Sequence, residues 1–260
     1  QGILGEIATN MPIRALAVAQ TGVVAAVLDD SDVTWIYLYN SKGEVAVRIK
    51  TTMSQFGYPI DISLSPNNNL AMISFLAEDE GTVKSSVAFY NFGEVGQNEV
   101  DNYMSGYDYP AVVPHVCFMT SELAYAMADD RLAFYEGAQK PVSKFEVLLE
   151  DEVRSVYHND TYVALVTYDT TGNHKYMITV YDSNGEKHLS QGFDLEYRNV
   201  IIKGENVYIY GETECSIYNL SGVEKYHGIM NTSISLLIPG DSVGRFTLVN
   251  QESVDTVELK

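Results

Sequence analysis

The chain has 260 residues, of which 46% are hydrophobic, and a formal net charge of −19 at pH 7. A chain of this length and apolar content can bury a sizeable core, so a disordered protein is excluded. The acidic balance argues against nucleic acid and anionic membrane surfaces as partners, because both require a basic footprint.

The first half of the chain reads as a short N-terminal stretch followed by three similar units. Residues 3–8 (ILGEIA) predict one strand that has nothing local to pair with. Units of four short strands are expected over residues 13–53, 59–103 and 112–149. The connection at residues 94–109 is rich in Gly, Asn, Asp and Tyr, and we expect a long loop there.

The second half repeats the same unit and then stops short. Four-stranded units are expected over residues 153–193 and 199–230. Three more strands are predicted at residues 234–238, 243–249 and 254–259. One strand is therefore left over at the N-terminus and one is missing at the C-terminus.

The unit at residues 153–193 shows the pattern most clearly. Its second strand, residues 161–168, is apolar at nearly every position, which is typical of a strand covered on both faces. Its third strand ends in Asp182-Ser-Asn-Gly185. An Asp or Asn at the start of a tight turn can accept a bond from the backbone two residues on, and a Gly three places later accepts a positive φ.

Endings of this kind recur along the chain. Asn40-Ser-Lys-Gly43 and Asn219-Leu-Ser-Gly222 follow the same pattern. The third strands close on tyrosines that lie 51, 45, 46 and 37 residues apart, namely Tyr39, Tyr90, Tyr135, Tyr181 and Tyr218. A period of about 40–50 residues with four strands per repeat indicates β-propeller blades.

The repeats predict an all-β, single-domain protein over residues 1–260. We expect a six-bladed β-propeller of four-stranded antiparallel blades, with seven blades as the alternative. Residues 3–8 would form the outer strand of the sixth blade and close the ring, because closure covers an exposed ladder edge and an open blade face.

The Tyr-Asn/Asp-x-x-Gly endings resemble those of WD40/YVTN-type β-propellers in the broad sense, over essentially the whole chain. The Trp-Asp closing pair and Gly-His opening of WD40 proteins proper are missing. The chain is most similar to uncharacterised, membrane-anchored propeller proteins of Gram-positive bacteria, a domain of unknown function. That resemblance implies the fold and an extracytoplasmic location, and it carries no functional residues. Because the sequence begins without Met, we expect a preceding tether; a cytoplasmic location is the alternative.

A first candidate site lies where the first strands of the blades would open onto the central channel. The residues at these openings are Arg14, Asp61, His115, Arg154 and Arg198. Arginines in such a ring can clamp a carboxylate or phosphate through paired hydrogen bonds. The alternative is structural, with each arginine paired to an acid of a neighbouring loop.

A second candidate site is the predicted loop over residues 94–109. It offers Asp101, Tyr103, Tyr107, Asp108 and Tyr109, and tyrosines beside carboxylates can stack on sugar rings or grip a peptide. The alternative is a loop folded over its own blade with the tyrosines packed.

Catalysis finds little support in the sequence. It has no G-x-S-x-G elbow, no H-E-x-x-H and no phosphate loop. The five histidines are scattered, and we expect no metal or cofactor and two free, buried cysteines, Cys117 and Cys215. Asp61 and His115 are the pair that a hydrolase would use.

The function expected from these features is that of a non-catalytic binding or scaffold propeller. It would engage a protein or glycan partner outside the membrane as a monomer, without nucleic acid and without membrane contact by the domain itself. One alternative is a sensor of small anions or peptide carboxylates that uses the arginine-lined mouth. The other alternative is a propeller hydrolase or lyase.

Overall fold

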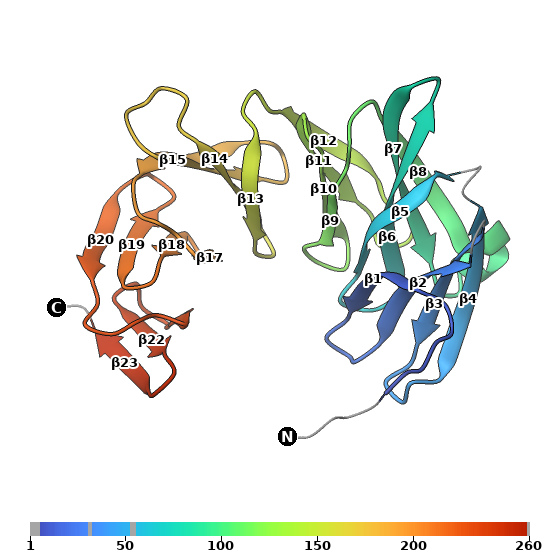
Figure 1. The fold of residues 1–260 in the computed structure, drawn as a ribbon, viewed down its shortest axis with the longest axis horizontal. Helices are drawn as coiled ribbons and strands as arrows, with labels where there is room; N and C mark the ends of the chain where they lie inside the picture. The colour runs from blue at the N-terminus through green and yellow to red at the C-terminus, as the bar shows by residue number, and fades with distance from the viewer. Residues whose placement is uncertain (1–5, 31–32, 53–55, 259–260) are drawn as a thin grey trace. The chain divides into compact units, whose positions relative to one another are not determined.

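A computed structural model describes residues 6–30, 33–52 and 56–258 (Figure 1). These residues form antiparallel sheets, together with two short 3-10 turns, η1 (Gly96–Asn98) and η2 (Val100–Asn102). The prediction of an all-β protein built from four-stranded antiparallel sheets is therefore confirmed.

The first three sheets lie within residues 1–150, which pack as one compact unit. Each has its strands in chain order from one edge to the other. The first sheet contains β1 (Ile13–Val18), β2 (Val24–Asp30), β3 (Val33–Tyr39) and β4 (Val45–Thr52). The second contains β5 (Tyr58–Leu64), β6 (Leu70–Asp79), β7 (Thr82–Asn91) and β8 (Tyr103–Tyr109). The third contains β9 (His115–Phe118), β10 (Leu123–Met127), β11 (Arg131–Glu136) and β12 (Val142–Leu148).

The remaining sheets lie within residues 151–260, which form a second compact unit. The fourth sheet contains β13 (Val153–His158), β14 (Tyr162–Tyr168), β15 (Tyr176–Asp182) and β16 (Lys187–Phe193). The fifth contains β17 (Asn199–Lys203), β18 (Asn206–Tyr210), β19 (Glu214–Asn219) and β20 (Glu224–Ile229). The sixth has three described strands, β21 (Leu236–Pro239), β22 (Arg245–Val249) and β23 (Val254–Glu258).

Two segments differ from what the sequence led us to expect. The predicted long loop ends at residue 102, because β8 follows as the fourth strand of the second sheet and pairs with β7. The strand predicted over residues 3–8 is absent from residues 6–8, which are irregular, and its first part lies outside the described residues. The irregular segment still contacts the first sheet, since Ile7 packs beside Ala26, Leu28 and Tyr39.

The turns between third and fourth strands form as their sequences predict. The side-chain Oδ1 of Asn40 accepts the N–H groups of Lys42 and Glu44, at 2.9 and 3.0 Å. Asp182 Oδ1 accepts those of Asn184 and Glu186, both at 2.9 Å. In all three turns of this type the closing glycine has a positive φ, at Gly43, Gly185 and Gly222.

Each repeating tyrosine marks a one-residue irregularity in pairing. The register between third and fourth strands shifts at the closing tyrosine of all five four-stranded sheets, at Tyr39, Tyr90, Tyr135, Tyr181 and Tyr218. A β-bulge at a fixed place bends the strand and increases its right-handed twist. The repeated tyrosine therefore marks the end of each third strand and also the bulge that adds twist to the sheet.

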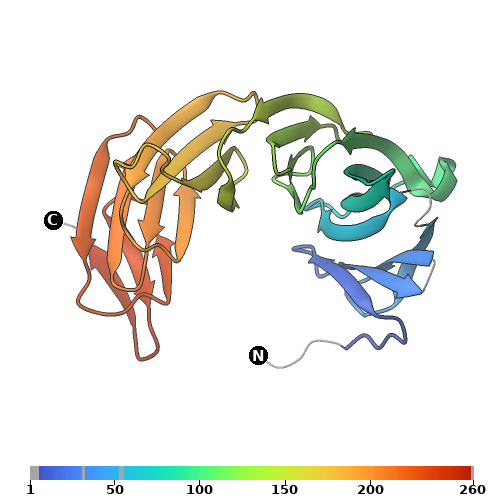
Figure 2. The same cartoon turned by 45° about the horizontal axis from the view of Figure 1, so that its top comes forward.

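The core lies between successive sheets within each unit (Figure 2). On β6, Ala71 and Ile73 pack with the first sheet, while Leu70 and Met72 pack with the third. On β18, Val207 packs with the fourth sheet and its neighbour Tyr208 with the sixth. Because successive side chains of a strand point to opposite faces, a second strand covered on both sides must be apolar throughout.

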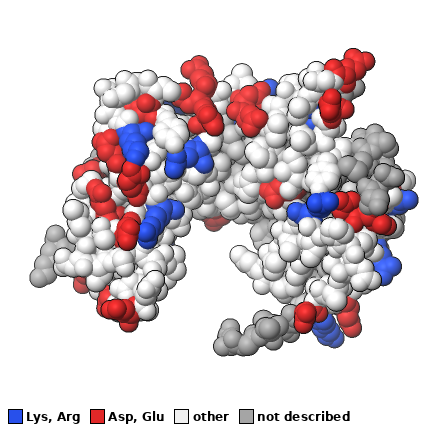
Figure 3. Space-filling model, viewed as in Figure 1, with Lys and Arg blue, Asp and Glu red and all other residues white. Residues whose placement is uncertain are grey.

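The face shown in Figure 3 carries more acidic than basic side chains. No helix among the described residues is long and apolar enough to cross a membrane.

Candidate functional site

Two of the predicted mouth arginines occupy the same unusual backbone position. Ile13 pairs with Leu28 and Ala15 with Val27, so Arg14 is left without a partner in the ladder. The fourth sheet skips Arg154 in the same way, between Val153 and Ser155. Arg198 comes just before β17, and its N–H donates to Tyr210 O.

Asp61 does not share the position of these arginines. In the second sheet the skipped residue is Ile60, because Pro59 pairs with Phe75 and Asp61 with Ser74. Asp61 therefore occupies the place that Ala15 holds in the first sheet. A shift of one residue moves a side chain to the other face of a strand, so the sequence alignment was one residue out at this point.

The arginines of the predicted mouth are paired with groups of their own units. Arg14 Nε donates to Asp29 Oδ2 at 2.9 Å, and its guanidinium lies over the Tyr58 ring. Arg198 forms an ion pair with Glu212 at 2.9 Å. Both arginines match the structural alternative, in which an acid of a nearby loop holds the side chain.

Arg154 is held by aromatic rings instead. Its guanidinium carbon lies 5.2, 5.4 and 5.9 Å from the ring centroids of Tyr168, Tyr176 and Tyr197, and it donates to the Tyr168 hydroxyl. Guanidinium groups stack favourably on tyrosine faces. No local pattern in the sequence indicated this arrangement, because its members come from the strands β13, β14 and β15 and from the loop before β17.

Asp61 and His115 are brought together as a pair. Asp61 Oδ2 contacts His115 Nδ1 at 2.9 Å and accepts the N–H of Val116 at 3.0 Å. The other ring nitrogen, His115 Nε2, lies 3.2 Å from the Tyr125 hydroxyl. Both nitrogens are thus engaged by the protein, and the pair ties strand β5 to strand β9.

The thiol of Cys117, which lies on the same strand as His115, has no nucleophilic character, and neither has that of Cys215. Burial raises the pKa of Cys117 to about 11, and that of Cys215 to about 12. A thiol attacks as its thiolate, so neither cysteine is activated near neutral pH. Neither cysteine forms a disulfide, as predicted from the sequence. Cys215 is buried, also as predicted, whereas Cys117 is only half-buried.

The tyrosines of the second candidate site lie on β8 and divide into packed and exposed side chains. Tyr109 is buried and hydrogen-bonded to the Tyr135 hydroxyl. The Tyr107 hydroxyl donates to Pro141 O and accepts the N–H of Ser143, both at 3.1 Å. These two tyrosines tie β8 to the third sheet.

Tyr103 differs from them because 36% of its surface is exposed. Its ring packs against Tyr90 and Phe56, and its hydroxyl lies over Gly106, where an added Cβ would collide with it. Asp101 and Asp108, the carboxylates of this site, are exposed as well.

The backbone just before Tyr103 is strained. Asp101 and Asn102 have φ of 53° and 58°, two consecutive left-handed residues that are not glycine. Such positions cost free energy unless the surroundings fix them. Part of that fixing is visible, since Asn102 Nδ2 donates to Asn91 O at 2.8 Å.

Two grooves have contrasting linings. A groove of about 630 Å³ on the first sheet is mainly apolar and includes Ile13, Leu16 and Val18. A groove of about 520 Å³ between the fourth and fifth sheets is polar, and contains His174 beside Asp194 and His227 beside Glu214. The sequence indicated neither groove. The lining of the first comes from residues 7–43 and that of the second from residues 174–227, and each depends on how the strands pair.

The predicted mouth residues fall in both compact units. Arg14, Asp61 and His115 belong to the first, and Arg154 and Arg198 to the second. Their convergence on one opening stays a prediction.

Solved structures similar to this chain share its architecture at low sequence identity. Hsv2 of Kluyveromyces marxianus, a WD40-like propeller, matches with a TM-score of 0.55 and 10% identity over 96% of this chain and 73% of that one. A protein from Lactobacillus plantarum matches with a TM-score of 0.54 and 10% identity over 98% and 83%. Hsv2p of Kluyveromyces lactis matches with a TM-score of 0.51 and 12% identity over 95% and 74%. A comparison with curated proteins finds no match.

Stacked four-stranded antiparallel sheets and these likenesses together define the class of the protein, a β-propeller of the WD40-like kind. Residues 1–259 match the model of the Family of unknown function (DUF5711), and the chain belongs to that family.

Proposed function

We propose that the protein is a non-catalytic propeller that binds a protein or glycan partner through the outer strand of its second sheet. Exposed Tyr103, preceded by strained backbone and flanked by Asp101 and Asp108, is the observation that carries this proposal. Backbone strain that is maintained at an exposed site supports a functional role.

The chemistry of this surface suits a ligand with both apolar and polar faces. Tyrosine presents a large ring with little side-chain entropy to lose, and carboxylates accept hydrogen bonds from sugar hydroxyls or basic side chains. The pKa of Tyr103 is raised by partial burial and then by the charge of Asp108, so its hydroxyl stays protonated. Strand β8 also lies at the edge of its sheet.

The proposal is tested with a glycan array and with chemical cross-linking of the purified protein to cell-envelope extracts. Substituting Tyr103→Ala or Asp108→Asn should weaken any binding detected by about tenfold or more, the range typical of a central interface side chain. Tyr168→Ala is the control, because Tyr168 is an exposed tyrosine of the fourth sheet. Binding that survives Tyr103→Ala undiminished would contradict the proposed surface.

The two alternative functions have less support. A sensor of anions would need the mouth arginines to give up their present contacts. Arg14 would have to leave Asp29, and Arg198 would have to leave Glu212. Arg154 would have to leave the ring of Tyr168. A hydrolase would need a reactive hydroxyl or a water molecule at His115 Nε2, and that nitrogen lies 3.2 Å from the Tyr125 hydroxyl, whose pKa is raised by burial.

We also propose that the propeller has six blades and closes into a ring. The sixth sheet supports this, because it has three described strands and leaves Leu236 and Ile238 exposed on the face opposite its core. The exposed apolar groove of the first sheet is the complementary feature. The N-terminal residues would supply the missing strand.

We propose an extracytoplasmic location, supported by the resemblance to membrane-anchored propellers of Gram-positive bacteria. Protease treatment of intact cells that express the native gene would digest the domain if it lies outside the membrane. A domain that stays intact until the cells are lysed would show the location to be cytoplasmic.

A further inference from the structure

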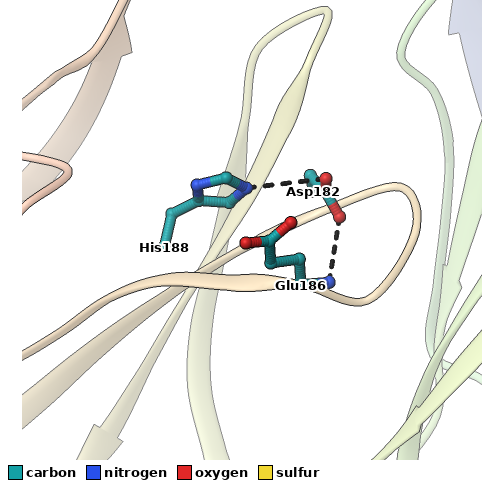
Figure 4. Close-up of side chains that lie close together, drawn as sticks. All are labelled: Asp182, Glu186 and His188. Atoms are coloured by element: carbon teal, nitrogen blue, oxygen red, sulfur yellow. Dashed lines mark hydrogen bonds and ion pairs between the residues drawn. The ribbon is translucent and has the colours of Figure 1, made fainter.

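The hairpin between β15 and β16 brings three potential metal ligands together. Asp182 ends β15, Glu186 closes the turn that follows, and His188 is the second residue of β16 (Figure 4). Their donor atoms all lie within 4.8 Å of one another. His188 is the residue that the pairing of β15 with β16 skips, since Val180 pairs with Leu189 and Tyr181 with Lys187. This bulge places the imidazole beside the turn residues Asp182 and Glu186.

The turn itself does not explain these three side chains. It needs one acceptor oxygen at its first position, and Asp182 Oδ1 supplies it by accepting the N–H groups of Asn184 and Glu186. Asn40 supplies the same oxygen in the first sheet. An asparagine is therefore sufficient for these two backbone hydrogen bonds. The second oxygen of Asp182 takes no part in them and accepts the side-chain Nδ2 of Asn184, at 3.3 Å, within the turn.

Equivalent turns elsewhere in the chain lack the full set. The first sheet has Asn40, Glu44 and Ala46 at the three positions. The fifth sheet has Asn219, Val223 and Lys225. The combination of two carboxylates and an imidazole belongs to the fourth sheet alone among these three turns.

His188 supplies a second, independent observation. Its Nε2 atom is shielded from solvent and makes no hydrogen bond, and Asp182 Oδ2 lies 3.5 Å from it. The ring is fixed in place by an edge-on contact with Tyr162, with centroids 5.2 Å apart. A shielded nitrogen without a hydrogen bond is unfavourable, and a bound metal ion would satisfy it.

The two inner donor atoms face one another across the hairpin, with 3.5 Å between His188 Nε2 and Asp182 Oδ2. Glu186 is exposed, so its carboxylate can turn toward the same point.

We propose that Asp182, Glu186 and His188 form a binding site for one divalent metal ion, with Zn²⁺ as the preferred ion. One imidazole with two carboxylates is a donor set that Zn²⁺ accepts, and three protein ligands leave a position for water. Calcium and magnesium prefer oxygen donors alone, so the imidazole selects against them. This inference is independent of the partner surface on the second sheet.

Calorimetric titration of the 260-residue protein with ZnCl2 tests the site. The wild-type protein should bind one ion at this hairpin, and Asp182→Asn and His188→Ala should each weaken that binding by about tenfold or more. Asp182→Asn keeps the acceptor oxygen of the turn, as Asn40 and Asn219 do, so it should melt at the wild-type temperature without metal. Glu186→Gln gives a third variant that leaves the turn residue unchanged.

His158→Ala is the matched control, since it removes an imidazole from the same sheet and should leave zinc binding unchanged. Added Zn²⁺ should raise the melting temperature of the wild type and of this control, but not of Asp182→Asn. Failure of Zn²⁺ to bind, or equal binding by the wild type and all three hairpin variants, would overturn the proposal. So would an NMR titration in which His188 gains a proton at neutral pH and Zn²⁺ fails to displace it.

Discussion

Single side chains connect neighbouring sheets at their inner strands. Asp61 joins β5 to β9 through the imidazole of His115 and the backbone of Val116. Ser63 adds a second link two residues on, because its hydroxyl accepts the N–H of Phe118 at 3.0 Å. Apolar packing is non-directional and does not by itself fix how two sheets are aligned. The hydrogen bonds of these polar residues fix the alignment of β5 with β9.

Removing the Asp61 carboxylate should therefore destabilise the first unit. Asp61→Ala leaves the N–H of Val116 and the ring of His115 without their acceptor, and we expect a loss of about 1–3 kcal/mol in the free energy of unfolding. Urea unfolding followed by tyrosine fluorescence measures it. Asp160→Ala, at an exposed turn, is the control and should change stability by less than about 0.5 kcal/mol. Equal stability of the two variants would remove the structural role given to this pair.

Glycines at the ends of strands face different surroundings even where their backbone is alike. Gly57, just before β5, has a φ of 89°, and an added Cβ would collide with the backbone oxygen of Leu76. Gly81, in the turn between β6 and β7, has a φ of 80° and nothing within 4 Å of that position. Both glycines have a positive φ, but only Gly57 has a close neighbour, so comparing substitutions at the two positions separates the cost of a steric collision from the cost of a positive φ.

Gly57→Ala should consequently cost far more than Gly81→Ala. We expect about 1 kcal/mol for Gly81→Ala, the usual cost of a left-handed alanine. For Gly57→Ala we expect roughly 3 kcal/mol or more, since backbone must move to admit the methyl group. Chemical denaturation of both variants gives the comparison, and similar midpoints would show that the segment before β5 yields easily.

The strands and their turns could be predicted because their signals are local. Apolar second strands and Asx-x-x-Gly turns placed five sheets to within a few residues. Strand β8 was taken for a loop because Ser105, Gly106 and Asp108 are residues that strands disfavour. Its pairing with β7 overrides that preference.

The candidate site was less predictable than the fold. The skipped residues Arg14 and Arg154 depend on pairing register, which no single strand reveals. The hairpin ligands Asp182, Glu186 and His188 had a visible signal, two donors spaced two apart after a turn carboxylate. That signal is short, and acidic turns without metal are common, so the sequence alone could not give it weight.

At the scale of the whole molecule, closure of the ring is the feature open to experiment. Leu16 on the first sheet and Val142 on the third are both 54% exposed. If the ring closes over the first sheet, Leu16→Lys buries a charge and should lower the free energy of unfolding by about 2 kcal/mol or more. Val142→Lys should stay within about 0.5 kcal/mol of the wild type. Equal, small effects in thermal melts would indicate that the face of the first sheet is open to water.

Deleting residues 1–9 gives a second route to the same question. It removes the strand proposed to complete the sixth sheet, and the melting temperature should fall sharply. An unchanged melting curve would refute closure by the N-terminus.

Four core clusters of the described residues each join one sheet to its neighbour in the chain. In an architecture of this kind each sheet contacts only its neighbours. A destabilising substitution in one sheet therefore weakens the interfaces with those neighbours and leaves the other interfaces unchanged. Insertions in the loops of one sheet can therefore lengthen its repeat without changing the cores of distant sheets. The uneven spacing of the chain's repeats, from 37 to 51 residues, is what independent drift of separate modules would leave behind.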